Sequence, residues 1–167
     1  KNKKNYFKAK LYLFEKLIKT KGTIITDEKI PEFKKIKNIA TNKNLNLFTL
    51  LDKKNNFQFL SHQYEHESQL LEIKYKNSIH KIKLNLIGKV QFKNVLMAVI
   101  ASIKSGINIQ DILNTIPKIK SVEGRFERVG RIKNNSKVIL DYAHTPDALK
   151  TCLKNIKEQF PGKKISL

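Results

Sequence analysis

The segment from Val138 to Phe160 constrains the fold of this chain most, because it reads as a strand, a polar loop and a helix in immediate succession. Val138-Ile139-Leu140 predicts a buried strand. Thr145-Pro146-Asp147 predicts a helix start, with Thr as the N-cap, Pro at the first helical position and an acidic residue in the first turn. Pro161-Gly162 ends the helix, and 164–167 reads as a strand just begun. This order predicts a β-loop-α-β unit, the opening of an α/β domain.

The loop between this strand and this helix carries the most informative side chains of the chain. It contains Asp141, Tyr142 and His144 within four residues. Ligands of open α/β sheets bind at the carboxyl ends of strands, and helix N-termini favour phosphates. An aspartate there can accept hydrogen bonds from ribose hydroxyls, and a histidine can contact a base or a phosphate. The alternative, that Asp141 and His144 only stabilise the turn, is equally compatible with their position.

The remaining sequence predicts further helices and strands joined by short turns. Apolar residues at helical or period-two spacing define them. They are helices over 6–18, 31–37, 92–104 and 111–116, and strands over 23–26, 71–75 and 79–86. Lys76-Asn77-Ser78 is the predicted hairpin turn, and the polar segment 118–123 is the predicted joint between two domains. The chain does not begin with Met and stops inside a predicted strand, so we expect an internal piece of a longer protein.

The formal net charge of +20 raises the possibility of nucleic-acid binding. Two observations argue against it. Arg, the usual reader of bases and phosphates, supplies only Arg125, Arg128 and Arg131 among 34 basic residues. The lysines are also spread along the whole chain. A basic nucleic-acid-binding module is therefore kept only as the non-enzyme alternative, and we expect no nucleic-acid partner.

The single cysteine and the short apolar runs indicate the compartment. Cys152 has no partner for an internal disulfide, and it falls on the apolar side of the predicted helix, where a small core residue is expected. No run of residues fits a transmembrane helix or a signal peptide. These features predict a cytoplasmic protein without a membrane partner.

One motif indicates zinc but is weak. His62-Gln63-Tyr64-Glu65-His66 spells H-x-x-E-H, the inverted zinc-protease signature. That chemistry needs a helix to place both histidines on one face, together with a third ligand. The flanking residues favour strand and loop instead, so a solvated loop is the expected structure and no metal is assigned to these histidines.

The strand, loop and helix start read Val138-Ile139-Leu140-Asp141-Tyr142-Ala143-His144-Thr145-Pro146-Asp147-Ala148-Leu149. This segment resembles the Mur ligases, in particular the UDP-N-acetylmuramoyl-tripeptide synthetases. Folylpolyglutamate and cyanophycin synthetases share the fold but carry Asn after the His, where this chain has Thr145. They are the alternative enzyme class.

Three further segments resemble the family in its order. They are Tyr6-Phe7-Lys8-Ala9-Lys10-Leu11-Tyr12-Leu13-Phe14, Gly88-Lys89-Val90-Gln91-Phe92-Lys93-Asn94 and Val122-Glu123-Gly124-Arg125-Phe126-Glu127. In the second, Val90 stands where the family has Phe, and Phe92 where it has Val. The resemblance covers nearly the whole chain, more loosely over 27–85. It implies that 1–121 is the second half of the central ATP-binding domain and that 122–167 begins the Rossmann-like C-terminal ligase domain.

The resemblance implies an ATP-dependent ligase of peptidoglycan synthesis. Such an enzyme phosphorylates the terminal carboxylate of UDP-MurNAc-L-Ala-D-Glu, and the amine of a diamino acid (meso-diaminopimelate or L-lysine) attacks the acyl phosphate. ATP and Mg²⁺ are the implied cofactors, and a monomer is expected. The phosphate-binding motif G-x-x-x-x-G-K-[ST] does not occur in this sequence. We therefore expect this chain to be inactive by itself.

The resemblance also assigns roles to five residues, each with a structural alternative. Lys10 is implied to be carbamylated and to help hold Mg²⁺, or else it extends past the edge of the core. Asn94 is implied to contact adenine, and it could also be a helix N-cap. Arg125 is implied to reach an ATP phosphate, or else it forms an exposed salt bridge with Glu127. Asp141 is implied to bind ribose and His144 to lie in the nucleotide site.

Overall fold

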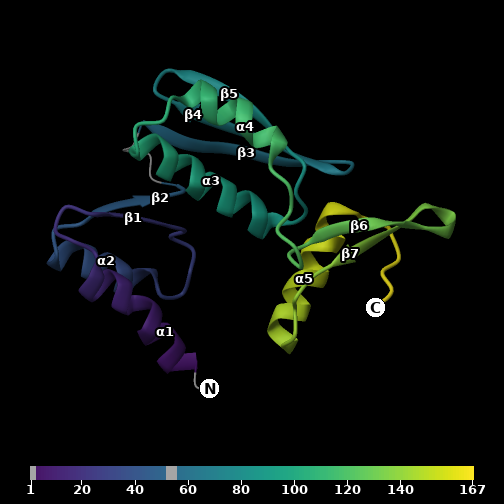
Figure 1. Cartoon of the computed structure of the whole chain (residues 1–167), viewed down its shortest axis with the longest axis horizontal. Helices are drawn as coiled ribbons and strands as arrows, with labels where there is room; N and C mark the ends of the chain where they lie inside the picture. Colours follow the sequence, from purple (N-terminus) through teal and green to yellow (C-terminus); the bar gives the residue numbers. More distant parts are fainter. Residues whose placement is uncertain (1–2, 52–55) are drawn as a thin grey trace. The chain divides into compact units, whose positions relative to one another are not determined.

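The computed structural model describes residues 3–51 and 56–167. The chain divides into two compact units, residues 1–58 and 59–167, and each contains helices and strands (Figure 1). The chain is therefore mixed α/β, as predicted. None of the helices in the described parts is both long enough and apolar enough to cross a membrane.

The first unit is built around a parallel β-α-β arrangement preceded by a helix. The elements are α1 (Lys3–Tyr12), the π-helical turn η1 (Leu13–Leu17), β1 (Thr23–Thr26), α2 (Phe33–Asn42) and β2 (Asn46–Thr49). The parallel strands β1 and β2 pair from Thr23↔Asn46 to Thr26↔Thr49, and α2 connects them. The predicted helix over 6–18 is confirmed, with a π-helical last turn. The predicted helix over 31–37 is also confirmed but begins later and extends to Asn42.

Both helices of this unit bury apolar side chains in one core. Its buried members come from α1, β1, α2 and the loop that follows, namely Leu11, Ile24, Ile36, Ala40 and Leu45. The end of the π-helical turn is held separately by Lys43, whose ammonium donates hydrogen bonds to the carbonyl oxygens of Glu15 at 2.9 Å and Ile18 at 3.0 Å. A lysine at a helix C-terminus satisfies carbonyl groups that lack helical partners.

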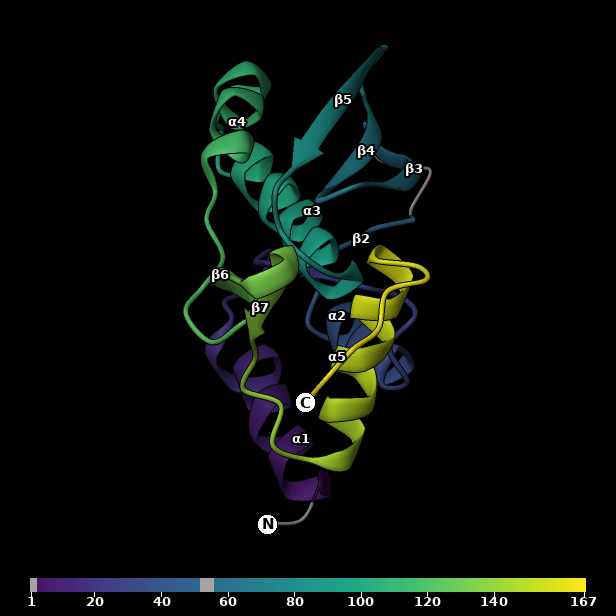
Figure 2. The ribbon, with the colours of Figure 1, turned by 90° about the vertical axis from the view of Figure 1, so that its right-hand side faces the viewer.

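The second unit begins with a three-stranded sheet in the order β3-β4-β5. Its strands are β3 (Phe57–Glu65), β4 (Ser68–Tyr75) and β5 (Ser78–Leu84). The predicted hairpin is confirmed, because β4 and β5 are antiparallel with Tyr75 opposite Ser78. The helix α3 (Lys89–Lys104) lies along one face of this sheet (Figure 2). Its inner face buries Phe92, Leu96, Val99 and Ile100.

A short helix and a turn lead from α3 to the last part of the chain. The helix is α4 (Ile109–Thr115), capped by the Asn108 side chain, which accepts from the backbone N–H of Gln110 at 2.8 Å. The 3₁₀ turn η2 (Ile116–Lys118) follows. The predicted helix over 111–116 is thus confirmed but starts earlier, because the asparagine cap precedes it.

The chain ends in a β-hairpin with one helix. The strands β6 (Glu127–Ile132) and β7 (Ser136–Leu140) are antiparallel, and η3 (Lys133–Asn135) joins them at the predicted turn. The helix α5 (Pro146–Gln159) begins as predicted, since the Thr145 hydroxyl oxygen accepts from the backbone N–H of Ala148 at 3.3 Å. Cys152 is confirmed as a core residue: it packs with Ile87 and Phe126, and burial, with the nearby charge of Asp141, raises the pKa of its thiol.

Two predictions for this region are wrong. Val138-Ile139-Leu140 forms a strand but not a buried one. Only Ile139 faces the helix, whereas the Leu140 side chain is 50% exposed on the other face of the hairpin. Residues 164–167 form no strand in the described structure, because the only strand paired with β7 there is β6. A strand forms only where a neighbouring strand satisfies its backbone groups.

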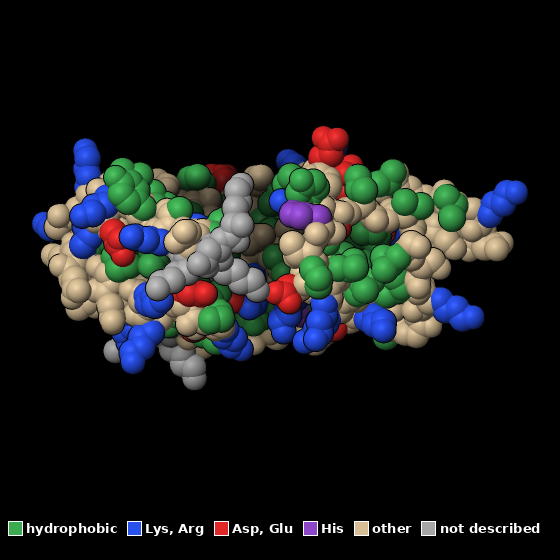
Figure 3. Space-filling model, turned by 90° about the horizontal axis from the view of Figure 1, so that it is seen from below, with side chains coloured by type: hydrophobic (Ala, Val, Ile, Leu, Met, Phe, Trp, Pro, Cys, Tyr) green, Lys and Arg blue, Asp and Glu red, His purple; other side chains and the backbone are tan. Residues whose placement is uncertain are grey.

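The basic residues do not collect in one place on the surface that Figure 3 shows. Lysine and arginine side chains are scattered over the visible face and are interspersed with acidic and hydrophobic side chains. This distribution agrees with the even spread of lysine along the sequence.

Candidate functional site

Two loops join side by side at one end of the β6–β7 hairpin. The first loop, residues 122–126, precedes β6, and the second, residues 141–145, follows β7. Glu127 lies opposite Leu140 in the hairpin, so both loops leave it at the same end. The backbone N–H of Tyr142 in the second loop donates to the carbonyl oxygen of Gly124 in the first, at 2.8 Å. We call this pair of joined loops the paired-loop site.

Asp141 fastens the two loops to each other. Its Oδ2 accepts a hydrogen bond from the backbone N–H of Phe126 at 3.0 Å, and its Oδ1 accepts from the backbone N–H of Ala143 at 3.0 Å. Phe126 is buried and has a φ of +47°, a conformation that costs a side-chain-bearing residue free energy. The structure thus shows a turn-stabilising role for Asp141. Each carboxylate oxygen has a second lone pair, so a ribose contact stays a prediction.

Arg125, Tyr142 and His144 form an exposed cluster on the paired-loop site. The Arg125 guanidinium lies 5.4 Å from the centre of the Tyr142 ring, and the His144 ring lies 4.9 Å from that ring at 60°. His144 Nδ1 is 2.9 Å from the carbonyl oxygen of Tyr142. Because a carbonyl can only accept, Nδ1 is the donor in this contact, and in the neutral ring Nε2 is then an acceptor. One cation and two aromatic faces in this arrangement suit an anionic ligand with a flat ring.

The salt bridge proposed as the alternative role of Arg125 is wrong. The Glu127 carboxylate turns back into its own loop, where it accepts from the backbone N–H of Gly124 at 2.8 Å. The guanidinium of Arg125 is directed to the Tyr142 ring instead. The sequence could not distinguish these partners, because Tyr142 reaches Arg125 only through the pairing of the two loops.

Asn94 lies on α3 and is exposed. It is not the helix N-cap, because α3 begins at Lys89 with Gly88 as its cap residue. Gln91 precedes Asn94 by three residues and so shares its side of the helix. The Gln91 side-chain amide donates to the carbonyl oxygen of Arg125 at 3.2 Å. The structure therefore brings this side of α3 to the paired-loop site.

Two buried amides of α5, which sequence reasoning missed, satisfy the N-terminus of α3. Asn155 Oδ1 accepts from the backbone N–H of Lys89 at 2.6 Å, and Gln159 Oε1 accepts from that of Gly88 at 2.8 Å. A Cβ on Gly88, whose φ is +88°, would lie 3.2 Å from Asn155 Oδ1, so glycine allows this close approach. The signal was available: Asn155 and Gln159 lie at helical spacing beside the apolar residue Cys152.

His62 of the H-x-x-E-H motif belongs to a partly buried polar network. The expected solvated loop is wrong here, because His62 lies on strand β3, and its ring stacks on the Phe92 ring at 4.3 Å. Its Nε2 is 2.8 Å from Gln69 Oε1, while the Gln69 amide donates to the Leu86 carbonyl at 2.7 Å. Burial lowers the pKa of His62. Among the described residues, no group of three or more His, Cys, Asp and Glu side chains could hold a metal ion.

Lys10 belongs to the first unit, whereas the other four candidates belong to the second. The Lys10 side chain is exposed beside the apolar face of α1, and its Nζ lies 4.5 Å from the centre of the Tyr6 ring. This position, exposed and over the face of an aromatic ring, agrees with the alternative that the side chain extends past the edge of the core.

A carboxylate that sequence reasoning missed lies after β1 in the same unit. Both oxygens of Glu28 are buried, and neither has a hydrogen-bond partner within the described residues. Glu28 follows Asp27 directly beyond the end of a parallel strand. Ligands of open α/β sheets bind at the carboxyl ends of strands, and this rule, which selects Asp141, also selects Glu28.

Comparison with known proteins gives the same family for both parts of the chain. Residues 1–102 match the Mur ligase middle domain, and residues 124–167 match the glutamate ligase domain of Mur ligases. The UDP-N-acetylmuramoyl-L-alanyl-D-glutamate--2,6-diaminopimelate ligase of Rickettsia montanensis is 32% identical over 158 residues, which are 93% of this chain and 32% of that protein. The chain thus spans about a third of the length of this relative.

Solved structures of Mur ligases share the fold. A structure of UDP-N-acetylmuramoyl-L-alanyl-D-glutamate--2,6-diaminopimelate ligase superposes with a TM-score of 0.70 at 21% identity, covering 95% of this chain and 32% of that one. The MurF ligase of Thermotoga maritima in complex with ADP gives a TM-score of 0.73 at 19% identity, covering 97% and 36%. The match of the middle-domain family to more than half of the sequence decides the assignment, and this chain belongs to the Mur ligase family.

Proposed function

We propose that the protein containing this chain is an ATP-dependent ligase that joins a diamino acid to UDP-MurNAc-L-Ala-D-Glu. The relatives from Rickettsia montanensis and Rickettsia prowazekii are named as ligases of that dipeptide and 2,6-diaminopimelate, at 32% and 30% identity. We therefore propose 2,6-diaminopimelate as the incoming amino acid rather than lysine. We also propose that the protein acts as a monomer in the cytoplasm, where a free buried thiol such as Cys152 is stable.

The paired-loop site is the observation that carries the nucleotide-binding part of this proposal. It presents the Arg125 cation, the rings of Tyr142 and His144, and the N-terminus of the 14-residue helix α5 at one place. In the proposed role, Arg125 neutralises charge on an ATP phosphate, which is the main demand of phosphoryl transfer. His144 offers Nε2 as an acceptor, and Asp141 offers its remaining lone pairs to ribose. Asn94, on the side of α3 that reaches this site, is proposed to contact adenine.

Magnesium is proposed only through Lys10. An ammonium group is not a magnesium ligand, so the described residues do not fit the ion until this side chain is carbamylated and becomes an oxygen donor. What the chain's own residues contribute is the positioning of ATP for attack by the substrate carboxylate.

The test uses the full-length protein purified with its natural flanking segments. ADP release is measured with ATP, with either UDP-MurNAc-L-Ala-D-Glu or a folate as the acceptor, and with each of 2,6-diaminopimelate, lysine and glutamate in turn. The proposal expects release that requires both the dipeptide substrate and 2,6-diaminopimelate. Release that requires a folate and glutamate instead would assign the protein to the folylpolyglutamate class.

A matched pair of variants then tests the site. Arg125→Gln should raise the KM for ATP at least tenfold, since a hydrogen bond to a charged group contributes about 1.5–3 kcal/mol. Lys133→Gln removes one positive charge from the exposed turn at the other end of the hairpin and should leave that KM unchanged. An equal rise in the KM for ATP in both variants would show that Arg125 acts only through net charge.

A further inference from the structure

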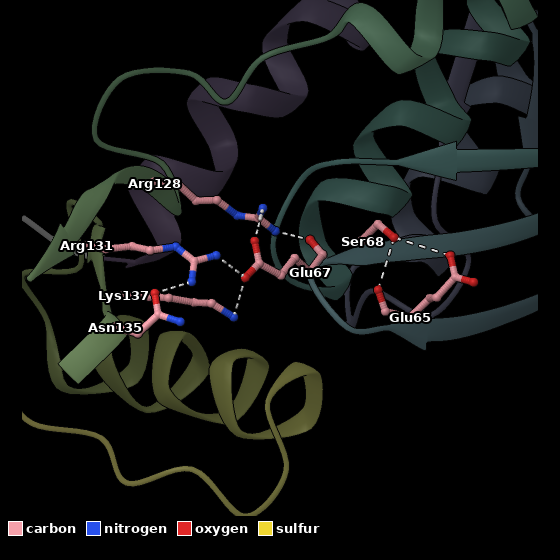
Figure 4. Close-up of polar contacts among 7 residues, drawn as sticks. All are labelled: Glu65, Glu67, Ser68, Arg128, Arg131, Asn135 and Lys137. Atoms are coloured by element: carbon pink, nitrogen blue, oxygen red, sulfur yellow. Dashed lines mark hydrogen bonds and ion pairs between the residues drawn. The ribbon is translucent and has the colours of Figure 1, made fainter.

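Glu67 gathers three cationic side chains from a distant part of the sequence. It lies in the turn between β3 and β4, and the cations come from β6 and β7 (Figure 4). Glu67 Oε1 lies 2.6 Å from an Arg131 guanidinium nitrogen and 2.8 Å from Lys137 Nζ. Glu67 Oε2 lies 3.4 Å from Arg128 Nη1, and Arg128 Nη2 also donates to the Glu67 backbone carbonyl. We call these four residues the Glu67 cluster.

The Glu67 cluster is better shielded and more constrained than an ordinary surface ion pair. The Lys137 side chain is 29% exposed, against 74% for the lysine of the Lys154–Glu158 pair. Lys137 Nζ also lies 4.4 Å from the centre of the Phe160 ring. One carboxylate that bridges several immobilised cations loses less to side-chain entropy and solvent than a single exposed pair does.

The Glu67 cluster connects the β6–β7 hairpin to strand β4, which holds the start of α3. Glu67 is two residues before Gln69, whose fully buried amide donates to the Leu86 carbonyl at 2.7 Å and the Gly88 carbonyl at 3.2 Å, where α3 starts. On the other side, β6 begins directly after the loop that contains Arg125, and β7 ends directly before Asp141. Fixing the hairpin against the β3–β4 turn therefore fixes both loops of the paired-loop site relative to α3.

We propose that Glu67 is a positioning residue for the nucleotide site: it holds the β6–β7 hairpin so that the paired-loop site faces the side of α3 that carries Gln91 and Asn94. This role rests on the proposed function. Glu67 itself touches none of the groups proposed to contact ATP. Its effect on the site passes through Arg128, Arg131 and Lys137.

The charge of Glu67 allows a test in which positioning and simple electrostatics predict opposite changes in the KM for ATP. Removing a negative charge from the enzyme by Glu67→Gln would by itself favour binding of anionic ATP. Loss of positioning has the reverse effect and should raise the KM for ATP about three- to tenfold, with a smaller change in kcat at saturating ATP. Glu65→Gln is the matched control. It removes the same charge two residues earlier, where Glu65 pairs with Lys83 at 3.3 Å and not with the hairpin.

A second readout does not depend on activity. Hydrogen exchange is followed by mass spectrometry in the full-length protein without substrates, on peptides that cover 122–127 and 141–145. Glu67→Gln should speed exchange in both peptides, and Glu65→Gln in neither. Unchanged exchange in Glu67→Gln would overturn the proposal, as would faster exchange with an unchanged KM, which would leave Glu67 a purely structural role. If the wild-type protein released no ADP, the proposed function would fail, while the exchange result would still decide whether Glu67 orders the two loops.

Discussion

Replacing Asp141 by Asn in the full-length protein should lower its stability by about 2–3 kcal/mol. The carboxylate accepts one backbone N–H with each oxygen, from Phe126 and from Ala143. An asparagine side chain has one oxygen, so its NH₂ group must face one of these N–H donors. One charge-assisted hydrogen bond is lost, and the other loses its charge. Such bonds contribute about 1.5–3 kcal/mol each, and the left-handed backbone at Phe126 also loses a constraint.

Urea unfolding of the wild type, Asp141→Asn and a control measures this change, and an ATP titration of the same samples measures KM. Asp111→Asn is the control, because Asp111 is exposed in the first turn of α4. We expect a lower urea midpoint for Asp141→Asn alone. An unchanged midpoint would refute the turn-stabilising role. If Asp141 also binds ribose, the KM for ATP should rise roughly ten- to a hundredfold. A lower midpoint with an unchanged KM would refute the ribose role.

Three further predictions concern other parts of the chain. Lys10→Ala should abolish ligation in the full-length enzyme, with partial rescue by small carboxylic acids, whereas Lys8→Ala, at another exposed position of the same helix, should not. Wild-type turnover in Lys10→Ala would remove Lys10 from the site. Burial lowers the pKa of His62 below 6.5, so the folded state favours the neutral ring, and the free energy of unfolding should decline as pH falls from 6.5 toward that lower pKa. In His62→Phe this part of the decline should disappear, and parallel curves of stability against pH for the two proteins would contradict the prediction. Asn155→Ala leaves the first backbone N–H of α3 unpaired and should lower the free energy of unfolding, measured in urea, by about 1–3 kcal/mol. Asn114→Ala, at an exposed position of α4, should lower it by under about 0.5 kcal/mol.

Local sequence rules predicted the features that depend on neighbouring residues. Thr145 and Pro146 start α5 as expected, because an N-cap hydrogen bond spans only three residues. The β4–β5 hairpin follows from alternating apolar residues and one turn. The strand at Val138 was recognised, but its burial was not predicted correctly. Burial depends on which elements cover each face, and in the described structure α5 covers only one face of the hairpin.

The parts of the site that sequence could not reveal depend on contacts between distant segments. Asp141 was singled out for ribose, but its partner Phe126 lies fifteen residues earlier and reaches it only because the loops pair. Asn155 caps a helix 66 residues away in sequence. Glu67 carries no sequence signal, since a glutamate in a turn is ordinary. Its importance follows from the cations that the hairpin brings to it from 61 or more residues away.

The three arginines show why the residue type at these contacts matters. Apart from Arg125, Arg128 and Arg131, which recur at intervals of three, all Lys and Arg positions of this chain are Lys. Each makes a contact that suits a planar guanidinium. Arg125 lies over the Tyr142 ring, and Arg128 uses two nitrogens at once, one for the carboxylate and one for the carbonyl of Glu67. Arg131 likewise divides its two terminal nitrogens between Glu67 and a side-chain amide of the hairpin turn. A lysine ammonium can also donate to two acceptors, as Lys43 does, but it does so from one rotatable nitrogen and not from a rigid planar fork. Two of the three arginines thus connect the hairpin to Glu67, and the third lies in the paired-loop site at the end of that hairpin.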